Sequence, residues 1–223
     1  MNKNQFHYQF VSQWYNKFFR KIYKMKTLNL IMSVAIAAGV LQSCGGNTQK
    51  DSKAFADSTN QAKDSSKNDT ATTSAAGLTV SKENSEFAVN AANGGMAEVE
   101  LGKLAQEKGT SQAVKDFGGM MVNDHSKANE ELMSLAKNKN ITLPATLGKD
   151  EQEAKDKLAA KSGAEFDKAY VENMLEDHKK DIKEFEDAGK NLTDPELKAF
   201  AIKTLPTLKM HLAAIQKIHD KVK

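Results

Sequence analysis

The chain has a single cysteine and a single arginine, and each shortage argues against one class of protein. Cys44 is the only cysteine among 223 residues, so an intramolecular disulfide framework is excluded. Arg20 is the only arginine, and the lysines are spread evenly along the chain. Proteins that bind nucleic acids instead cluster basic residues on one face, often with aromatic side chains between them. The sequence therefore predicts no nucleic-acid partner.

Acidic residues are absent before position 44, and this absence distorts the charge of the whole chain. The chain has 32 basic and 29 acidic residues, of which six basic residues precede position 44. The remainder has 26 lysines against 29 acids, a net charge of 26 − 29 = −3. The basic isoelectric point is thus a property of the N-terminal leader.

The stretch MKTLNLIMSVAIAAGVLQSCGG, which begins at Met25, has the composition of a secretory signal. Its apolar run, from Leu28 to Leu41, is too short for a comfortable transmembrane span. The end, LQSC, resembles the lipobox of bacterial lipoproteins, whose cysteine thiol is lipidated after cleavage. We expect residues 1–43 to be a leader, with Met25 as the natural start. Cys44 is then the lipidation site of an exported, membrane-anchored lipoprotein, which either faces the periplasm or lies in the outer membrane. The alternative is a leader that is cleaved elsewhere and leaves Cys44 as a free thiol.

The residues after the cysteine are mostly Ser, Thr, Lys, Asp, Asn and Ala up to Val80. Such a stretch buries too little apolar surface to offset its conformational entropy. We expect residues 44–80 to be the lipidated cysteine and a disordered tether. The folded domain is then residues 81–223, a normal size for one domain.

Hydrophobic residues in 81–223 recur at helical spacing, and no alternating segment predicts a strand. Gly109 ends the first helix, Ser162 to Glu165 form a capping box, and Asp194 is an N-cap before a proline. These features predict an all-α, ferritin-like four-helix bundle with an extra short helix between the second and third long helices. The apolar stripes cover residues 87–105, 114–135, 171–185 and 197–222, and the short helix lies near 149–160.

Each apolar stripe contains one titratable residue, namely Glu98, His125, His178 and His211. Burying such a group costs several kcal/mol unless it finds a partner, so four of them near mid-helix favour a shared site. Three imidazoles and a carboxylate suit zinc, iron or copper. These residues are the candidate metal ligands, and no catalytic residue is predicted.

The motif Met-x-x-Asp-His occurs on both the second and the third long helix. Met121 and Met174 lie one turn before a histidine and add soft thioethers, which favour Cu(I). Asp124 and Asp177 adjoin the histidines and point about 100° away, so we expect them to support the ligands without binding the ion.

An alternative explains the same residues without a metal. A histidine on a bundle stripe is more often a hydrogen-bonded core residue, and Met is a common core filler. Counting outward from the turns separates Glu98 and His125 by about 7 Å in depth, and His178 and His211 by about 10 Å. The sequence leaves both interpretations open.

Four segments together resemble a known family of bacterial envelope proteins: SEFAVNAANGGMAEVELGKLAQEKG, VKDFGGMMVNDHSKANEEL, SGAEFDKAYVENMLEDHKK and LKAFAIKTLPTLKMHL. The family is defined as a ferritin-like domain of unknown function, and the similarity covers nearly all of Ser85 to Leu212. The resemblance implies a ferritin-like bundle and an exported location, and it implies no activity.

Ferritin chemistry does not transfer with the fold. Di-iron bundles use Glu-x-x-His motifs, whereas Val122, Leu175 and Leu208 stand three residues before the core histidines. Motifs for nucleophilic hydrolysis, phosphate binding and dinucleotide binding are also absent from the sequence. We expect a non-enzymatic, lipid-anchored interaction or stress-related module of the cell envelope. The alternative is a periplasmic metal-binding protein that uses the His/Met/Glu cluster.

Overall fold

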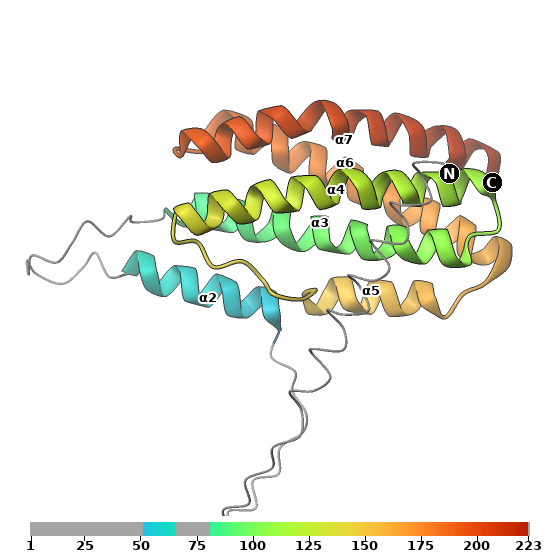
Figure 1. Ribbon diagram of the computed structural model, residues 1–223, viewed down its shortest axis with the longest axis horizontal. Coiled ribbons are helices and arrows are strands. Elements are labelled where there is room, and N and C mark those ends of the chain that lie inside the picture. The colour runs from blue at the N-terminus through green and yellow to red at the C-terminus, as the bar shows by residue number, and fades with distance from the viewer. Residues whose placement is uncertain (1–50, 66–80, 223) are drawn as a thin grey trace, which may run out of the picture. The chain divides into compact units, whose positions relative to one another are not determined.

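The computed structural model describes residues 51–65 and 81–222, which form six α-helices and no strand (Figure 1). The predicted all-α class is confirmed for this part of the chain. In these two ranges, no helix is long and apolar enough to cross a membrane. The helices are α2 (Ser52–Ser65), α3 (Lys82–Lys108), α4 (Gln112–Asn138), α5 (Lys149–Ala159), α6 (Gly163–Asn191) and α7 (Pro195–Val222).

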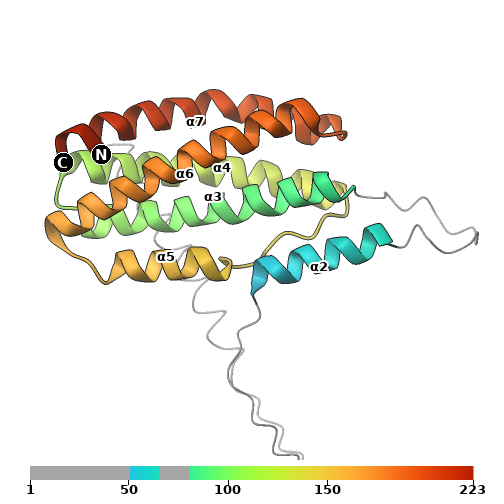
Figure 2. The same cartoon turned by 180° about the vertical axis from the view of Figure 1, so that it is seen from behind.

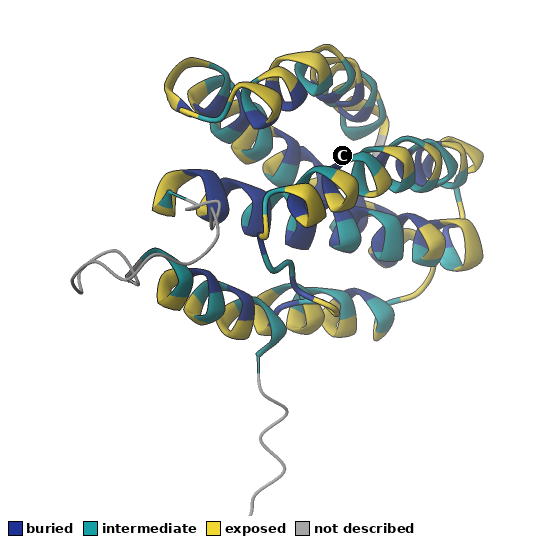
Figure 3. Ribbon diagram, turned by 60° about the vertical axis from the view of Figure 1, so that its left-hand side comes forward, coloured by how far each residue is buried: buried dark blue, intermediate teal, exposed yellow. Residues whose placement is uncertain are grey.

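The four long helices pack in two pairs, α3 with α4 and α6 with α7, each joined by a short connection. α4 also contacts α7, and α3 contacts α6, so the four enclose a common interior (Figures 1 and 2). The shorter α2 and α5 lie along the α3 side, and α5 also contacts α6. Buried residues lie on the sides of the long helices that face one another (Figure 3).

A capping residue fixes the start of α7, whereas the start of α6 has no side-chain cap. The Asp194 Oδ1 accepts hydrogen bonds from the backbone amides of Glu196 (3.0 Å) and Leu197 (2.9 Å), as the predicted N-cap requires. The predicted capping box of α6 is wrong, because the Ser162 side chain makes no cap hydrogen bond. Gly163, the next residue, has a left-handed backbone (φ 59°) that breaks the geometry of a capping box.

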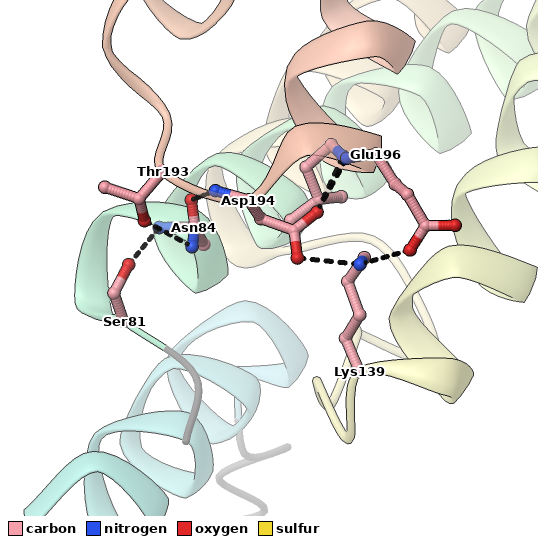
Figure 4. A network of polar contacts seen from close by, with 7 residues as sticks. Ser81, Asn84, Lys139, Thr193, Asp194 and Glu196 are labelled. Carbon is pink, nitrogen blue, oxygen red and sulfur yellow. Dashed lines mark hydrogen bonds and ion pairs between the residues drawn. The ribbon is translucent and has the colours of Figure 1, made fainter. Parts of the chain in front are cut away.

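A polar network ties the end of α4 to the starts of α3 and α7 (Figure 4). Lys139 Nζ lies 2.7 Å from Asp194 Oδ2 and 2.6 Å from Glu196 Oε2. Asn84 Nδ2 donates to Thr193 Oγ1 at 3.0 Å. The same aspartate therefore caps α7 and anchors the end of α4.

Part of the expected tether is ordered, which corrects the prediction for residues 52–65. α2 is held by pairing between side chains and backbone: Asn60 donates to the Thr142 carbonyl and accepts from its amide, both at 2.8 Å. The Ser52 hydroxyl oxygen accepts from the amides of Ala145 (2.9 Å) and Thr146 (3.2 Å). The composition argument missed α2 because hydrogen bonds to a connection far away in the sequence help to hold it. The leader and Cys44 lie outside the described residues.

The interior contains two apolar clusters, one toward each end of the long helices. The first includes Phe87, Leu132, Phe185 and Leu208, and the second includes Leu101, Met121, Met174 and Ile215. Along every long helix, the predicted titratable residue stands between the members of these two clusters.

One close helix contact depends on paired glycines. A Cβ added at Gly118 would lie 2.6 Å from the Gly102 carbonyl oxygen, and one added at Gly102 would lie 2.7 Å from the Gly118 oxygen. Because neither residue has a Cβ, the backbones of α3 and α4 approach closely.

Candidate metal centre

The four titratable residues predicted from the stripes meet at one level of the interior. Glu98, His125, His178 and His211 are all buried, with at most 6% of any residue exposed. The imidazole centroids are 5.2 Å apart for His125 and His211, 5.4 Å for His178 and His211, and 5.8 Å for His125 and His178. The convergence that the sequence left open is therefore present.

The depth offsets counted from the sequence were too large, because the reference points were not at the centres of the connections. α3 ends at 108 and α4 begins at 112, so Glu98 and His125 lie 12 and 15 residues from the midpoint at 110. α6 ends at 191 and α7 begins at 195, so His178 and His211 lie 15 and 18 residues from the midpoint at 193. Both differences are three residues, or about 4.5 Å. The side chains of these four residues are long enough to reach across this remaining difference in depth.

Glu98 lies between two of the histidines. The His125 Nδ1 is 2.7 Å from Glu98 Oε2, and the His178 Nε2 is 3.5 Å from Glu98 Oε1. The Nδ1–H of His178 donates to the Met174 carbonyl at 2.9 Å. When His125 is neutral and donates from Nδ1, its Nε2 carries the lone pair. His178 likewise carries its lone pair on Nε2, facing the carboxylate.

His211 is oriented by the helix opposite. Its Nε2 lies 3.0 Å from Asp124 Oδ2, so the neutral ring donates there and carries its lone pair on Nδ1. Phe117 packs edge-on against the rings of His211 (6.4 Å between centroids) and His178 (6.0 Å). The aromatic contact and the hydrogen bond together restrict the rotation of the ring.

Each imidazole thus has one partnered and one unpartnered nitrogen. Within the cluster, the buried ring nitrogens without a hydrogen-bond partner are Nε2 of His125, Nε2 of His178 and Nδ1 of His211. One ring nitrogen from each residue lies within 4.8 Å of the others. Tetrahedral zinc with Zn–N bonds of about 2.0–2.1 Å places its nitrogens about 3.3 Å apart, so small ring rotations would close the site around an ion.

The surroundings keep the histidines neutral. Burial lowers the pKa of His125 to about 4. Burial also lowers the pKa of His178 and of His211, because an imidazolium loses its hydration in the interior. Neutral imidazole is the form that binds a metal, so the site is prepared for an ion at neutral pH.

Asp181, one turn beyond His178 on α6, completes the charged surroundings. Burial raises the pKa of Glu98. A hydrogen bond between the Asp181 and Glu98 carboxyls offsets part of this rise. Burial also raises the pKa of Asp181, and the charge of Glu98 raises it further. Asp181 was missed in the sequence, although its His-x-x-Asp spacing places it on the same face as His178.

Of the other residues predicted for the site, the two methionines pack beside it, and the two aspartates act on its ligands. Met121 and Met174 are fully buried in the second apolar cluster, and Met174 meets the site through its carbonyl oxygen. Asp124 accepts a hydrogen bond from His211 on α7, and not from His125, its neighbour in the sequence. Burial raises the pKa of Asp177 to about 6, and its charge acts on Glu98.

Comparisons with known proteins agree with the helical fold. No curated protein matches the chain. The fold is similar to the crystal structure of a DUF305 fragment from Deinococcus radiodurans, with a TM-score of 0.56 and 9% sequence identity over 63% of this chain and 97% of that chain. At this identity the likeness concerns the fold alone. Residues 69–218, more than half of the chain, match the profile of a family described as Domain of unknown function (DUF4142), and the chain belongs to that family.

Proposed function

We propose that the protein binds one divalent transition-metal ion between its long helices, with His125, His178 and His211 as nitrogen ligands and Glu98 as the carboxylate beside them. The observation that carries the proposal is that each of these buried histidines has one ring nitrogen without a partner, and that one ring nitrogen from each lies within 4.8 Å of the others. An unsatisfied buried polar atom costs about 1–3 kcal/mol, so an ordinary core would gain nothing from three of them.

Glu98 and His178 add a second reason. Glu98 Oε1 and His178 Nε2 are both buried and unpartnered, and they face each other at 3.5 Å. An ionised carboxylate and a neutral imidazole nitrogen are both acceptors, so they repel each other in this arrangement. A cation between them would remove the repulsion, as would a proton on the carboxylate.

The partners of the rings also fit a metal centre. Ligating histidines commonly donate their other N–H to a carboxylate or a backbone carbonyl, which fixes the ring and its tautomer. Here Glu98, Met174 and Asp124 accept from the three rings. Three imidazole ligands with a carboxylate nearby suit Zn²⁺ or Cu²⁺.

The metal site would belong to a ferritin-like four-helix bundle exported to the cell envelope. The packing of the four long helices supports the bundle. The resemblance of the four sequence segments to the family of envelope proteins supports the location. The LQSC sequence supports a lipid anchor on Cys44. Cys44→Ser is expected to release the protein from the membrane fraction, and retention through high-salt washing would argue against this anchor.

Metal binding is tested on the full chain without a polyhistidine tag, stripped with EDTA and titrated with Zn²⁺ and with Cu²⁺. We expect one ion per chain and a stabilisation of about 2.7 kcal/mol at a hundredfold excess of ion over the dissociation constant. The variant in which His125, His178 and His211 are all Leu should lose this response. His219→Leu is the matched control, since His219 lies on α7 outside the cluster.

Two further results would separate the alternatives. Met121→Leu and Met174→Leu should leave binding unchanged, because these side chains pack in the apolar cluster. If neither ion shifts the unfolding of the wild type, under oxidising or reducing conditions, the metal function is wrong and the histidines are architectural.

A further inference from the structure

A polar pocket of about 430 Å³ opens on the side of the bundle where α2 and α5 lie. Its walls come from four helices, with Asp57 on α2, Asn90 on α3, Lys149 on α5 and Glu184 on α6. Six carboxylates and three lysines line it, so its formal charge is negative when the acids are ionised. Such a pocket raises the local concentration of cations near its mouth.

The pocket adjoins a smaller cavity that borders the histidine cluster. This inner cavity has a volume of about 20 Å³, and its lining includes Glu98 and His125. A space of this size holds about one water-sized particle. Gly94 and Asp181 line both the inner cavity and the outer pocket. These two residues therefore form the boundary between the solvent-filled pocket and the candidate ligands.

Gly94 leaves this boundary thin. A Cβ at position 94 would meet only Asp181 Oδ1, at 3.9 Å, which is an ordinary contact. A small side chain therefore fits there without displacing the helix. It would, however, occupy space between the pocket and the cavity.

The other polar approach to the cluster is less suitable for an ion. The Asp124 side chain is 24% exposed and contacts His211, but it contacts Nε2, the nitrogen that donates. An ion arriving there would meet an N–H rather than a lone pair. The approach through Asp181 instead leads to Glu98, whose Oε1 is unpartnered.

We propose that the polar pocket between α2, α3, α5 and α6 is the route by which a divalent cation enters and leaves the histidine cluster. Asp181 is the carboxylate that passes the ion from the pocket to Glu98, and Gly94 keeps the passage open. This inference rests on the proposed metal function and adds the route and the residues that control it.

The route is tested by the rates of exchange rather than by affinity. Zn²⁺ uptake by the EDTA-stripped full chain is followed by stopped flow against a chromogenic chelator, and release is started with excess EDTA. Gly94→Val should slow uptake and release by the same factor, about tenfold or more, and keep the dissociation constant within about threefold. A blocked passage must slow both directions equally, because it changes neither end state. Gly94→Ala should give a smaller effect of the same kind.

Asp181→Asn keeps the shape of the side chain and removes the proton that the carboxyl can give up to an arriving cation, so it should also slow both rates. Asp187→Asn is the matched control, because Asp187 is an exposed carboxylate on α6 that lines neither cavity. Gly119→Ala controls for adding a methyl group to a helical glycine. Both controls should exchange zinc at the wild-type rates.

The outcomes separate the route from the metal function. If the wild type binds zinc and the Gly94 and Asp181 variants exchange it as fast as the controls do, the route is wrong and the metal function stands. If Asp181→Asn weakens the affinity without slowing uptake, Asp181 is a ligand and the passage role is wrong. If the wild type binds no zinc, both proposals fall.

Discussion

The His125 imidazole gives a quantitative test of how strongly the interior acts on the cluster. Burial lowers the folded-state pKa of this ring to about 4, from an ordinary value of 6.5. Between these values the unfolded chain binds a proton that the folded chain does not. The stabilising contribution is therefore fully present above pH 6.5 and is lost as the pH falls to about 4. The difference corresponds to about 3 kcal/mol.

His125→Asn isolates this contribution. Asparagine can still donate to Glu98 from its side-chain amide, but it does not titrate. The variant will lose some packing at every pH, which adds a constant difference in the free energy of unfolding. On top of that constant, the wild type should lose about 3 kcal/mol relative to the variant between pH 7 and pH 4. The buried carboxyls titrate in both proteins, so their contributions largely cancel in the comparison.

The measurement is urea denaturation of both proteins at intervals from pH 4 to pH 7.5, with EDTA present so that no metal contributes. His219→Asn, which removes a partly exposed imidazole from α7, controls for the loss of a histidine as such. If the difference between wild type and His125→Asn stays constant within about 0.5 kcal/mol across this range, the ring is not held in a strongly desolvated state. The account of the site as a set of buried neutral ligands would then fail.

Three further predictions concern the scaffold around the site. Gly118→Ala should destabilise the protein in urea denaturation, despite the better helix propensity of alanine, because its Cβ would lie 2.6 Å from the Gly102 carbonyl oxygen. In the control Gly119→Ala, the added Cβ meets only the Gln106 side chain, at 3.2 Å, so this variant should be neutral or stabilised. Asp194→Ala should cost about 1–2 kcal/mol through the lost cap and the lost partner of Lys139, whereas Asp194→Asn should keep most of the cap in thermal unfolding. Asn60→Ala should abolish the hydrogen-exchange protection of the Thr142 amide, and unchanged protection would show that α2 does not dock through this pair.

The helices could be predicted from the sequence because their causes are local. The 3.6-residue recurrence of apolar side chains, the stop at Gly109 and the cap at Asp194 all act within a few residues. α2 could not be predicted this way. Its decisive partner, Thr142, lies 82 residues from Asn60 in the chain, and no local pattern encodes that pairing.

The candidate site divides in the same manner. The four titratable residues on the stripes were visible in the sequence, because a charged group on a buried face needs a partner. The role of the methionines was not. Met121 and Met174 share a face with their histidines, but each lies four residues, about 6 Å, away along the helix axis. That displacement places them in the apolar cluster beside the site.

The sequence alone determined which faces are buried, where the long helices lie and which titratable residues those faces carry, because these features follow from spacing within single segments. Only the tertiary structure decided that Glu98 and three histidines from four helices meet at one depth, since this depends on connection lengths and side-chain reach. It also decided that Asp124 on α4 accepts a hydrogen bond from His211 on α7, and that Asp181 and Gly94 lie between the cluster and the outer pocket. Contacts between helices depend on the positions of both partners, and a single helical pattern specifies only one of them.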